Sequence, residues 1–323
     1  MLKPSVLILM ATFEGERFIA EQLESLAAQD HGDWELLIAD DGSSDQTRSR
    51  IAEFMQKPSL CRYNWALIDG PRKGAAANFM FLLAQAHQRI AEGRSNAQFI
   101  ALADQDDVWL PHKLSLALRA MSAQPQKPTL WCSSVRYWSE QSLQRTTQQS
   151  LTPRYPLSFS NALVQNMVRG NTVVINRQAL DLIARTANEQ SVVMHDWWLY
   201  LLMSACGACI IYSDEPTVLY RQHDANVVGA GASWSARLKR FLFMLEGGFM
   251  PWNRCHLARL KQLVDCHGSI LAPGVAQKIL CFEQMLQARS PINRLKWLIQ
   301  GEFYRQTMAE NLSLRLALIL GKF

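Results

Sequence analysis

The sequence predicts an α/β protein with a mostly parallel sheet flanked by helices, followed by a helical extension at the carboxyl end. Short apolar runs alternate with segments of helical period through the first 125 residues, which is typical of a parallel sheet covered by helices. Two of these runs end in aspartate clusters, in the segments LLIADDGSSDQT and FIALADQDDVWLP. Because ligands bind at the carboxyl ends of the strands in such sheets, the same pattern predicts where a site lies.

The first 125 residues contain the elements of this α/β pattern in a regular order. VLILM at 6–10 is the first strand, and in the segment after it Phe18, Ile19, Gln22, Leu23 and Leu26 keep helical spacing. The further expected elements are a strand at 35–39, a helix capped by Ser43, Ser44 or Asp45, a strand at 65–68, a helix at about 76–90, a strand at 99–103 and a helix begun by Pro111.

Beyond residue 125 the regular alternation stops. We expect a strand at LWCSSVRYW, followed by a polar, Gln-rich segment that forms a surface loop or a mobile lid. Apolar runs resume at NTVVIN, HDWWLYLLMSA, CIIY and TVLYRQH. The uncharged stretch 197–213 only reaches the lower limit of ~17 residues for a membrane span, so a buried helix followed by a strand is expected. The lone pair Cys206 and Cys209 is interpreted as packing, because no second pair completes a zinc site.

The last 91 residues differ from the rest in charge. Residues 233–323 contain thirteen Lys or Arg and five Asp or Glu. The net charge of the whole chain is +5, so residues 1–232 by themselves are net negative. Trp234, Leu238, Phe241, Leu242 and Leu245 share one helical face, and the final residues fit a helix or a strand. This region is expected either to bind an anionic membrane surface, or to be a helical appendage that packs on the preceding part of the chain or forms a dimer. Nucleic acid is not expected as a partner, because the remaining chain is net negative.

Composition places the chain among globular proteins of a reducing compartment. Hydrophobic residues make up 49% and charged residues 19% of its 323 residues, which is ordinary for one large or two modest domains. The seven cysteines are odd in number and lack framework spacing, which argues against a disulfide-stapled secreted protein. The amino-terminal residues predict a first strand and not a signal peptide, because no small-residue cleavage site follows them.

The aspartate clusters predict a metal site. Carboxylates converging on one crevice repel each other, and a cation or hydrogen-bond donors among them relieve that repulsion. Mg²⁺ and Mn²⁺ prefer hard oxygen ligands and are commonly held by one or two carboxylates together with phosphate oxygens. A divalent cation that carries a phosphorylated ligand is therefore the expected occupant.

Four blocks of the sequence resemble a known family. ATFEGERFIAEQLESLAAQ, ADDGSSDQT, DQDDVWLP and HDWW occur in an order and spacing that resemble a family 2 glycosyltransferase of the A-type nucleotide-sugar fold. HDWWLYLL and YRQHDANVVGA look like its bacterial rhamnosyltransferase branch. The resemblance covers residues 5 to about 230. It implies a donor-binding half at 1–125 and an acceptor-binding half at 126–232, with 233–323 as a basic, mostly helical region outside it.

The resemblance implies a set of donor-binding residues. Thr12 and Phe13 would hold and stack the nucleobase, and Asp41 would accept the imide N–H of uracil or thymine. The further residues implied to lie at the donor are Glu14, Lys73, Gly74, Asn78, Asp104 and Gln105. Other interpretations stay open: Phe13 as a core residue, Asp41 in an Asp-Gly turn and Lys73 as a solvated side chain.

Asp104–Gln105–Asp106 is implied to be the DXD-type metal site. By resemblance, Asp106 binds Mg²⁺ or Mn²⁺ directly and Asp104 contacts the ribose or a metal-bound water. His223 matches a position where some relatives supply a histidine to the same metal, and a structural histidine is the alternative. Asp107 is a candidate helix cap ahead of Pro111.

The general base and the acceptor site are implied to lie in two further segments. The family places its base at Asp196, which would take the proton of the acceptor hydroxyl as that hydroxyl attacks the anomeric carbon. Trp197 and Trp198 suit apolar sugar faces, and Gly170 and Asn171 resemble the acceptor-side loop. An N-cap role for Asp196 and a buried tryptophan pair are the alternatives.

The function implied is inverting transfer of L-rhamnose from dTDP-L-rhamnose to a hydroxyl of a lipid-linked or surface polysaccharide, as in O-antigen, lipopolysaccharide core or capsule synthesis. The expected location is the bacterial cytoplasm, peripherally at the cytoplasmic face of the inner membrane. The alternatives are another donor such as a UDP-hexose, or an inactive nucleotide-binding scaffold at a membrane. A sugar nucleotidyltransferase is disfavoured, because no glycine-rich, basic triphosphate loop lies near the first strand.

Overall fold

The computed structural model describes residues 5–123, 126–138, 148–187, 192–222, 242–243 and 246–323. The chain divides into two compact units that interleave along the sequence. Unit 1 consists of residues 1–151, 168–187 and 208–223, and unit 2 of residues 152–167, 188–207 and 224–323. The predicted functional halves, with boundaries at 125 and 232, concern donor and acceptor binding and stay predictions.

Unit 1 is built on one sheet of eight strands in the order β3-β2-β1-β4-β7-β6-β8-β5. Strands β1 to β4 pair in parallel, while β7 and β5 pair antiparallel with their neighbours. The long strands β6 and β8 are parallel to each other. The strands are β1 Val6–Thr12, β2 Trp34–Asp40, β3 Trp65–Asp69, β4 Phe99–Asp104, β5 Val108–Trp109, β6 Thr129–Trp138, β7 Val174–Asn176 and β8 Cys209–Arg221.

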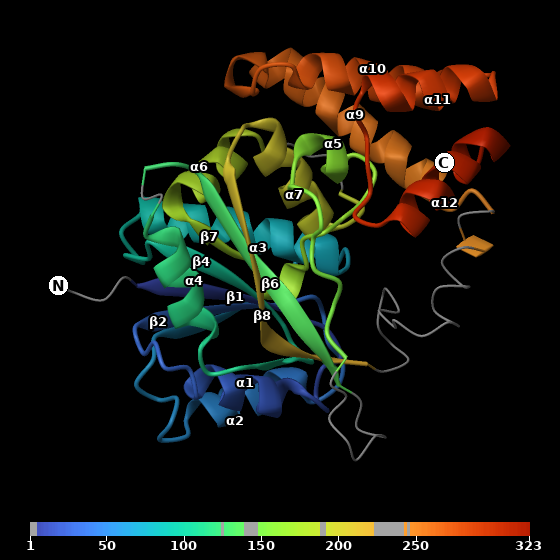
Figure 1. The fold of residues 1–323 in the computed structure, drawn as a ribbon. Coiled ribbons are helices and arrows are strands. Elements are labelled where there is room, and N and C mark those ends of the chain that lie inside the picture. Colours follow the sequence, from blue (N-terminus) through green and yellow to red (C-terminus); the bar gives the residue numbers. More distant parts are fainter. Residues whose placement is uncertain (1–4, 124–125, 139–147, 188–191, 223–241, 244–245) are drawn as a thin grey trace. The chain divides into compact units, whose positions relative to one another are not determined.

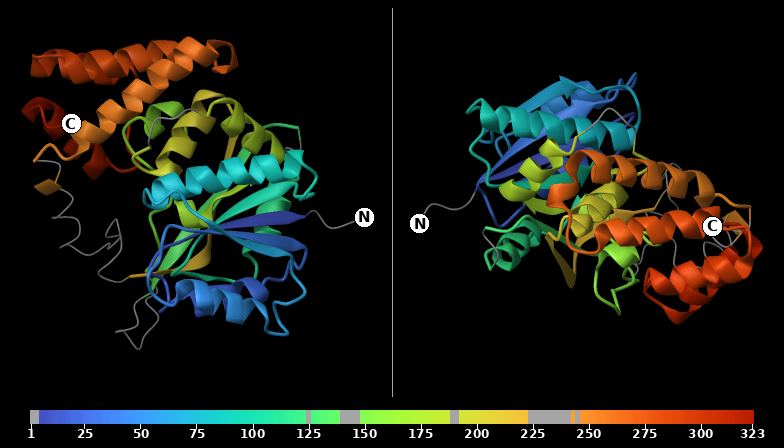
Figure 2. Two further views of the ribbon diagram at one scale, coloured as in Figure 1. Left: turned by 180° about the vertical axis from the view of Figure 1, so that it is seen from behind. Right: turned by 90° about the horizontal axis from the view of Figure 1, so that it is seen from above.

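Helices cover both faces of this sheet (Figure 1). Helices α1 and α2 lie together on one face, and α3 lies on the opposite face, where it packs against α6 (Figure 2). Strands β1 and β4 are almost wholly buried between these layers, which explains why they are uninterrupted apolar runs. The helices of unit 1 are α1 Ile19–Ala27, α2 Thr47–Met55, α3 Ala75–Ala91, α4 Lys113–Met121 and α6 Arg177–Arg185, with a 3₁₀ turn η1 at Gly170–Thr172.

Unit 2 is helical in the part that the structure describes. Its elements are α5 Phe159–Ala162, α7 His195–Ala205, α9 Phe249–His267, a 3₁₀ turn η2 at Gly268–Ile270, α10 Val275–Gln287, α11 Pro291–Gln300 and α12 Met308–Leu320. The ambiguous final stretch is therefore a helix, which Thr307 caps by accepting a hydrogen bond from the Glu310 amide. Most of the expected helical face of Trp234 to Leu245 lies outside the described residues.

The carboxyl-terminal helices pack on the segment around α5 and on α7. The Gln306 side chain accepts hydrogen bonds from the backbone amides of Arg154 and Tyr155, and Asn161 donates to the Tyr304 carbonyl. The Ala272 amide donates to the Ala205 carbonyl at the end of α7. One side of the basic region therefore completes the unit that contains Asp196. Among the helices described, none is both long enough and apolar enough to cross a bilayer.

Candidate active site

Four parallel strands end in polar residues at one edge of the sheet. Thr12 of β1 is in register with Asp40 of β2, which is in register with Asp69 of β3. Asp104 ends β4 beside Ala11 of β1. Since the carboxyl ends of parallel strands meet at the same edge, these side chains gather where a ligand site is expected.

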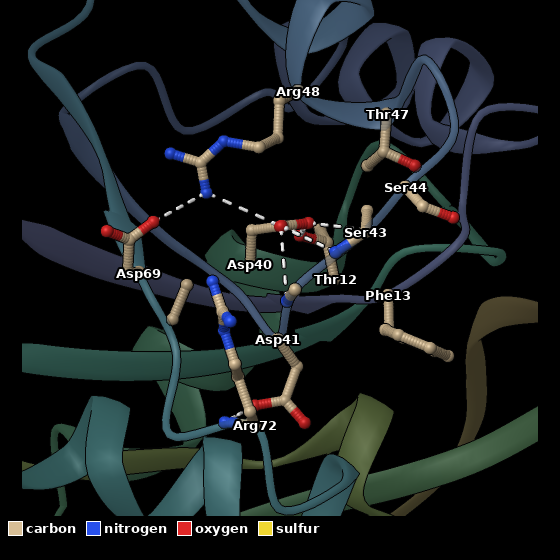
Figure 3. Close-up of polar contacts among 12 residues, drawn as sticks. Thr12, Phe13, Asp40, Asp41, Ser43, Ser44, Thr47, Arg48, Asp69 and Arg72 are labelled. Carbon is tan, nitrogen blue, oxygen red and sulfur yellow. Dashed lines mark hydrogen bonds and ion pairs between the residues drawn. The ribbon is translucent and has the colours of Figure 1, made fainter.

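Asp40 organises the turn that follows β2 (Figure 3). Its buried carboxylate accepts hydrogen bonds from the Thr12 hydroxyl at 3.0 Å and the Ser43 hydroxyl at 2.6 Å. Arg48 of α2 bridges Asp40 and the exposed Asp69, at 3.4 and 2.9 Å. Burial by itself raises the pKa of Asp40, but the hydrogen bonds from Ser43, Thr12 and Arg48 outweigh it and hold the pKa below its usual value. Asp40 is therefore a charged structural anchor.

Asp41 points away from Asp40 and holds the next loop (Figure 3). One carboxylate oxygen accepts the Arg72 amide at 2.6 Å and the other accepts the Gly74 amide at 2.7 Å. A Cβ at Gly70 would lie 2.9 Å from the same carboxylate and 3.0 Å from the Asp40 carbonyl, so only glycine lets the loop come this close. Each carboxylate oxygen has a second lone pair. The predicted contact of Asp41 with a base imide stays a prediction that this geometry permits.

The loop after β1 presents an aromatic ring to solvent. The Phe13 side chain is 56% exposed, so its interpretation as a core residue is wrong. Its backbone is held at both ends by Gln105, which accepts from the Phe13 amide at 2.9 Å and donates to the Phe13 carbonyl at 2.8 Å. A Cβ at Gly15 would meet the Gln105 amide oxygen at 2.2 Å. The Gln105 side chain therefore joins the β1 loop to the DXD segment.

Glu14 links the same loop to the start of α2. Its carboxylate accepts hydrogen bonds from the Ser44 amide at 2.7 Å and the Ser44 hydroxyl at 2.9 Å. In return, the Glu14 amide donates to the Ser43 hydroxyl. The expected caps Ser43, Ser44 and Asp45 do not occupy the N-cap position of α2, which is Gln46. Their side chains bond to Glu14 and to the Glu16 amide of the segment after β1 instead. In addition, Ser43 donates to Asp40 and Asp45 accepts from the Thr47 amide.

The remaining predicted donor residues lie on the loop and helix after β3. Lys73 and Gly74 are exposed, and Gly74 is the N-cap of α3 with a φ of 86°. Asn78 is buried in α3, where its amide donates to the Ala39 carbonyl of β2 at 2.8 Å. Asn78 thus ties α3 to the sheet, and a direct contact between it and a donor stays a prediction.

Three aspartates at the end of β4 and directly after it form a cluster that suits a divalent cation. One carboxylate oxygen from each of Asp104, Asp106 and Asp107 lies within 4.8 Å of the others. Asp104 and Asp106 are half-buried, and Asp107 is buried. Burial and the negative charges of Asp106 and Asp104 raise the pKa of Asp107 well above its usual value. Because hard oxygen donors of this kind are what Mg²⁺ and Mn²⁺ prefer, the residues fit the predicted metal.

A buried hydrogen-bond network supports this aspartate cluster. The Asn171 side chain donates to the Asp107 carboxylate, and the buried Lys113 ammonium donates to the Asn171 carbonyl at 2.6 Å. Burial lowers the pKa of Lys113 well below its usual value, although the Asp107 and Asp104 charges oppose this. The expectation that Asp107 caps a helix is wrong, because α4 begins at Lys113 with His112 as its N-cap. Gly170 and Asn171, expected at the acceptor, lie in η1 of unit 1 next to this network.

Arg221 at the end of β8 fixes the backbone of the same segment. Its Nε donates to the Asp106 carbonyl at 2.8 Å, and its own amide donates to the Asp107 carboxylate at 3.2 Å. The guanidinium is buried over the rings of Phe18 and Trp138 and pairs with Glu21. His223, expected to be a metal ligand, lies two residues further on and outside the described residues.

We expect Arg221→Met to loosen the aspartate cluster. The variant leaves the Asp106 carbonyl without its buried donor, which costs about 1–3 kcal/mol of folding free energy, and it frees the segment that carries the carboxylates. Denaturant unfolding should show this loss, and titration of Mn²⁺ followed by electron paramagnetic resonance should show weaker binding. Arg177→Met, which removes the i,i+4 pair with Asp181 on α6, should change stability by less than about 0.5 kcal/mol. Wild-type Mn²⁺ affinity in the Arg221 variant would refute the positioning role.

Asp196 lies in unit 2, in the first turn of α7. Its buried carboxylate accepts a hydrogen bond from the Trp197 amide at 2.7 Å. Met194 is the N-cap of the helix, so the alternative of Asp196 as N-cap is wrong. A carboxylate in the first turn of a helix interacts favourably with the positive end of the helix dipole.

Trp197 and Trp198 are buried inside unit 2. The Trp197 indole N–H donates to the Ala162 carbonyl at 2.7 Å, and its ring contacts His256 of α9 at 4.6 Å between centroids. The Arg259 guanidinium lies 4.2 Å above the Trp198 ring. Their predicted contact with acceptor sugars is untested. In this structure the two rings join α7 to α5 and α9.

Comparison with known proteins identifies the family to which this chain belongs. Residues 7–181 match the family model described as Glycosyl transferase family 2. The chain belongs to glycosyl transferase family 2. The dTDP-rhamnosyl transferase RfbG of Shigella flexneri is 29% identical over 240 residues, which cover 72% of this chain and 77% of that protein. The predicted family and its rhamnosyltransferase-like resemblance are confirmed.

Another relative and two solved structures extend the comparison. WfgD of Escherichia coli, a UDP-Glc:alpha-D-GlcNAc-diphosphoundecaprenol beta-1,3-glucosyltransferase, is 34% identical over 117 residues, 36% of this chain and 40% of WfgD. S. aureus TarS 1–349 with UDP-GlcNAc has a TM-score of 0.53 at 14% identity, covering 98% of this chain and 89% of TarS 1–349. The Pyrobaculum calidifontis mannosyltransferase PcManGT with GDP-Man and Mn²⁺ has a TM-score of 0.50 at 16% identity, covering 96% and 88%. These structures share the fold with this glycosyltransferase, which confirms the predicted A-type class.

Sequence reasoning missed several residues that build the site of this family 2 glycosyltransferase. Asp69 follows an apolar strand as Asp40 and Asp104 do, so the same rule would have found it. The other missed residues are Arg48, Arg72, Lys113 and Arg221. For Lys113 and Arg221 the sequence offered no signal, because a basic residue next to apolar neighbours is ordinarily an exposed one.

Proposed function

We propose that this glycosyltransferase transfers L-rhamnose from dTDP-L-rhamnose, with inversion, to a hydroxyl of a lipid-linked saccharide. The observation that carries the proposal is the arrangement of Asp41, Phe13 and the aspartate cluster at one edge of the sheet, taken with the similarity to a dTDP-rhamnosyl transferase over 72% of the chain. The acceptor class is supported by the diphosphoundecaprenol acceptor in the name of WfgD. O-antigen, core or capsule synthesis at the cytoplasmic face of the inner membrane is the setting that such an acceptor implies.

The donor half would bind the nucleotide with residues of unit 1. The exposed ring of Phe13 offers a stacking surface for thymine, and the free lone pairs of Asp41 offer an acceptor for its imide N–H. Asp104 and Asp106 would hold Mg²⁺ or Mn²⁺, with Asp107 behind them. When bound, this cation supplies positive charge that stabilises the departing dTDP.

Asp196 would act as the general base. As the acceptor oxygen forms its bond to the anomeric carbon, the bond from that carbon to the phosphate oxygen breaks, and the hydroxyl proton passes to the Asp196 carboxylate. Attack opposite the leaving diphosphate inverts the configuration. One carboxylate, acting as the base, suffices for this single displacement. A retaining reaction by double displacement would also need a side chain that attacks the anomeric carbon.

A donor panel tests the proposal. The full chain is incubated with Mg²⁺ or Mn²⁺, a polyprenyl-diphosphate-linked saccharide and, in turn, dTDP-rhamnose, UDP-glucose, UDP-N-acetylglucosamine and GDP-mannose. Release of nucleoside diphosphate is expected to be at least tenfold faster with dTDP-rhamnose than with the other donors, because dTDP-rhamnose alone would match the contacts to both the base and the sugar. Chelation of the metal should stop this release.

Two other results would replace the proposal. Uracil and thymine share the imide N–H, so a UDP-hexose transferase is the second candidate, favoured by the similarity to WfgD. Faster release with UDP-glucose would support that candidate. If no donor releases nucleotide although a nucleotide sugar binds, the chain is a nucleotide-binding scaffold.

A further inference from the structure

Helix α12 is apolar on two opposite sides. Leu314, Ala317 and Leu318 are buried against the rest of unit 2. On the other side five large apolar side chains are exposed, and Leu312, Leu316, Ile319 and Leu320 each follow another of the five by three or four residues, which places them with Met308 on one side of the helix. Met308 and Leu312 are 80% and 67% exposed. An exposed apolar stripe on a helix whose other side is already buried indicates a surface that binds something.

The neighbouring helix α11 has the same property. Leu298 faces inward, while Ile292 and Ile299, two turns apart, are 77% and 73% exposed. Helices α11 and α12 contact each other, and Arg294 of α11 donates to the Leu318 carbonyl of α12. The exposed apolar side chains of both helices thus belong to one helix pair, drawn in red in Figure 2. Monomeric soluble proteins rarely leave so much apolar surface uncovered unless it binds something.

The charges around these side chains indicate which partner fits. Lys296 and Arg315 are exposed among the apolar residues of α11 and α12, and Arg289 and Lys322 are exposed just beyond their ends. The acidic residue within these two helices is Glu310, whose carboxylate is hydrogen-bonded to Gln165 and Thr307. Just beyond α11, the exposed Glu302 is paired with Lys278 of α10. Apolar stripes flanked by basic residues match a bilayer with anionic headgroups. A self-association face of this charge would set like charges against each other.

We propose that the exposed faces of α11 and α12, here called the α11–α12 surface, dock on a bilayer that contains anionic phospholipid. The proposal rests on the proposed function, since a lipid-linked acceptor is reached from the membrane surface. The thirteen residues of α12 rise about 20 Å, a length suited to lying in the interface with the apolar stripe among the acyl chains. Residues 301–307, which join α11 to α12, hold the segment around α5 through Tyr304 and Gln306, so docking brings the unit of Asp196 to the lipid.

Vesicle flotation of the full chain tests the proposal. Vesicles of phosphatidylcholine alone are compared with vesicles of phosphatidylcholine and phosphatidylglycerol at three to one. We expect strong flotation with the anionic vesicles and weak flotation with the neutral ones. Lys296→Gln with Arg315→Gln should lower the anionic partition constant roughly thirtyfold, because each basic residue near the surface contributes about a factor of five. Ile292→Ser, Ile299→Ser, Leu312→Ser and Leu316→Ser together should abolish binding.

Matched variants and a second measurement separate the outcomes. Leu151→Ser with Arg50→Gln changes one exposed apolar and one exposed basic residue of unit 1, and it should float like wild type. Circular dichroism melting confirms that every variant is folded. Flotation that is equal in wild type and both surface variants overturns the proposal. So does a dimer, detected by sedimentation, that dissociates in the four-serine variant without any lipid binding. Asp196→Asn should float like wild type, so a failure of the rhamnosyl transfer assay leaves the docking result standing.

Discussion

Replacing Asp196 with asparagine is expected to lower the rate of glycosyl transfer by about 10²–10⁴, the range that general-base catalysis contributes. Asparagine keeps an oxygen that can accept the Trp197 amide hydrogen bond, so the first turn of α7 should persist. What is lost is the negative charge that receives the acceptor proton. Donor binding should be unchanged, because the nucleotide contacts are proposed to lie in unit 1.

Two measurements on the Asp196 variant separate catalysis from folding. Turnover is read as nucleotide release in the presence of acceptor, and the donor dissociation constant is read by isothermal calorimetry. Asp181→Asn is the matched control, because Asp181 of α6 is a partly exposed aspartate paired with Arg177 and His87. Turnover within a factor of three of wild type in the Asp196 variant would place the general base elsewhere.

Replacing Asp106 with asparagine is expected to have opposite effects on the metal-free and metal-bound protein. Without metal, the change removes a negative charge that lies beside Asp104 and Asp107. Relief of that repulsion should raise folding stability by up to about 1 kcal/mol, the energy of two unit charges 4 Å apart in a water-like dielectric. With Mn²⁺ present, the loss of a ligand should weaken metal binding roughly 100-fold or more, above the effect of losing a supporting hydrogen bond.

Thermal melting with and without Mn²⁺ measures both effects in one experiment. Wild type should gain stability on addition of Mn²⁺, because a ligand that binds only the folded state stabilises it. The Asp106 variant should melt higher than wild type without metal and gain little from it. The turnover of the Asp106 variant should be lower than that of wild type, in parallel with its weaker metal binding. An unchanged Mn²⁺-induced shift in the Asp106 variant would remove Asp106 from the metal site, and the Asp181 control should behave as wild type throughout.

Much of unit 1 could be read from local sequence patterns. Strands β1 and β4 are buried on both faces, so they are uninterrupted apolar runs with no alternation to confuse the assignment. The aspartates that follow the strands then share one edge, because parallel strands all end on the same side of a sheet. The helical period of α1 and α3 was equally clear. The order of β6, β7 and β8 in the sheet could not be predicted, because hydrophobic periodicity identifies a strand but does not indicate which strands pair with it.

The sequence alone determined the family, the fold class and the candidate metal cluster, because these depend on short motifs and on the order of the elements along the chain. Only the tertiary structure decided what supports that cluster. Arg221 reaches Asp106 across 115 residues, and Gln105 reaches Phe13 across 92. The tertiary structure also decided that the basic region packs on the segment around α5 and on α7, and that α11 and α12 expose apolar side chains. A side chain's partner depends on where the backbone brings distant segments together, and burial of a charge such as that of Lys113 or Arg221 becomes favourable only once those partners are in place.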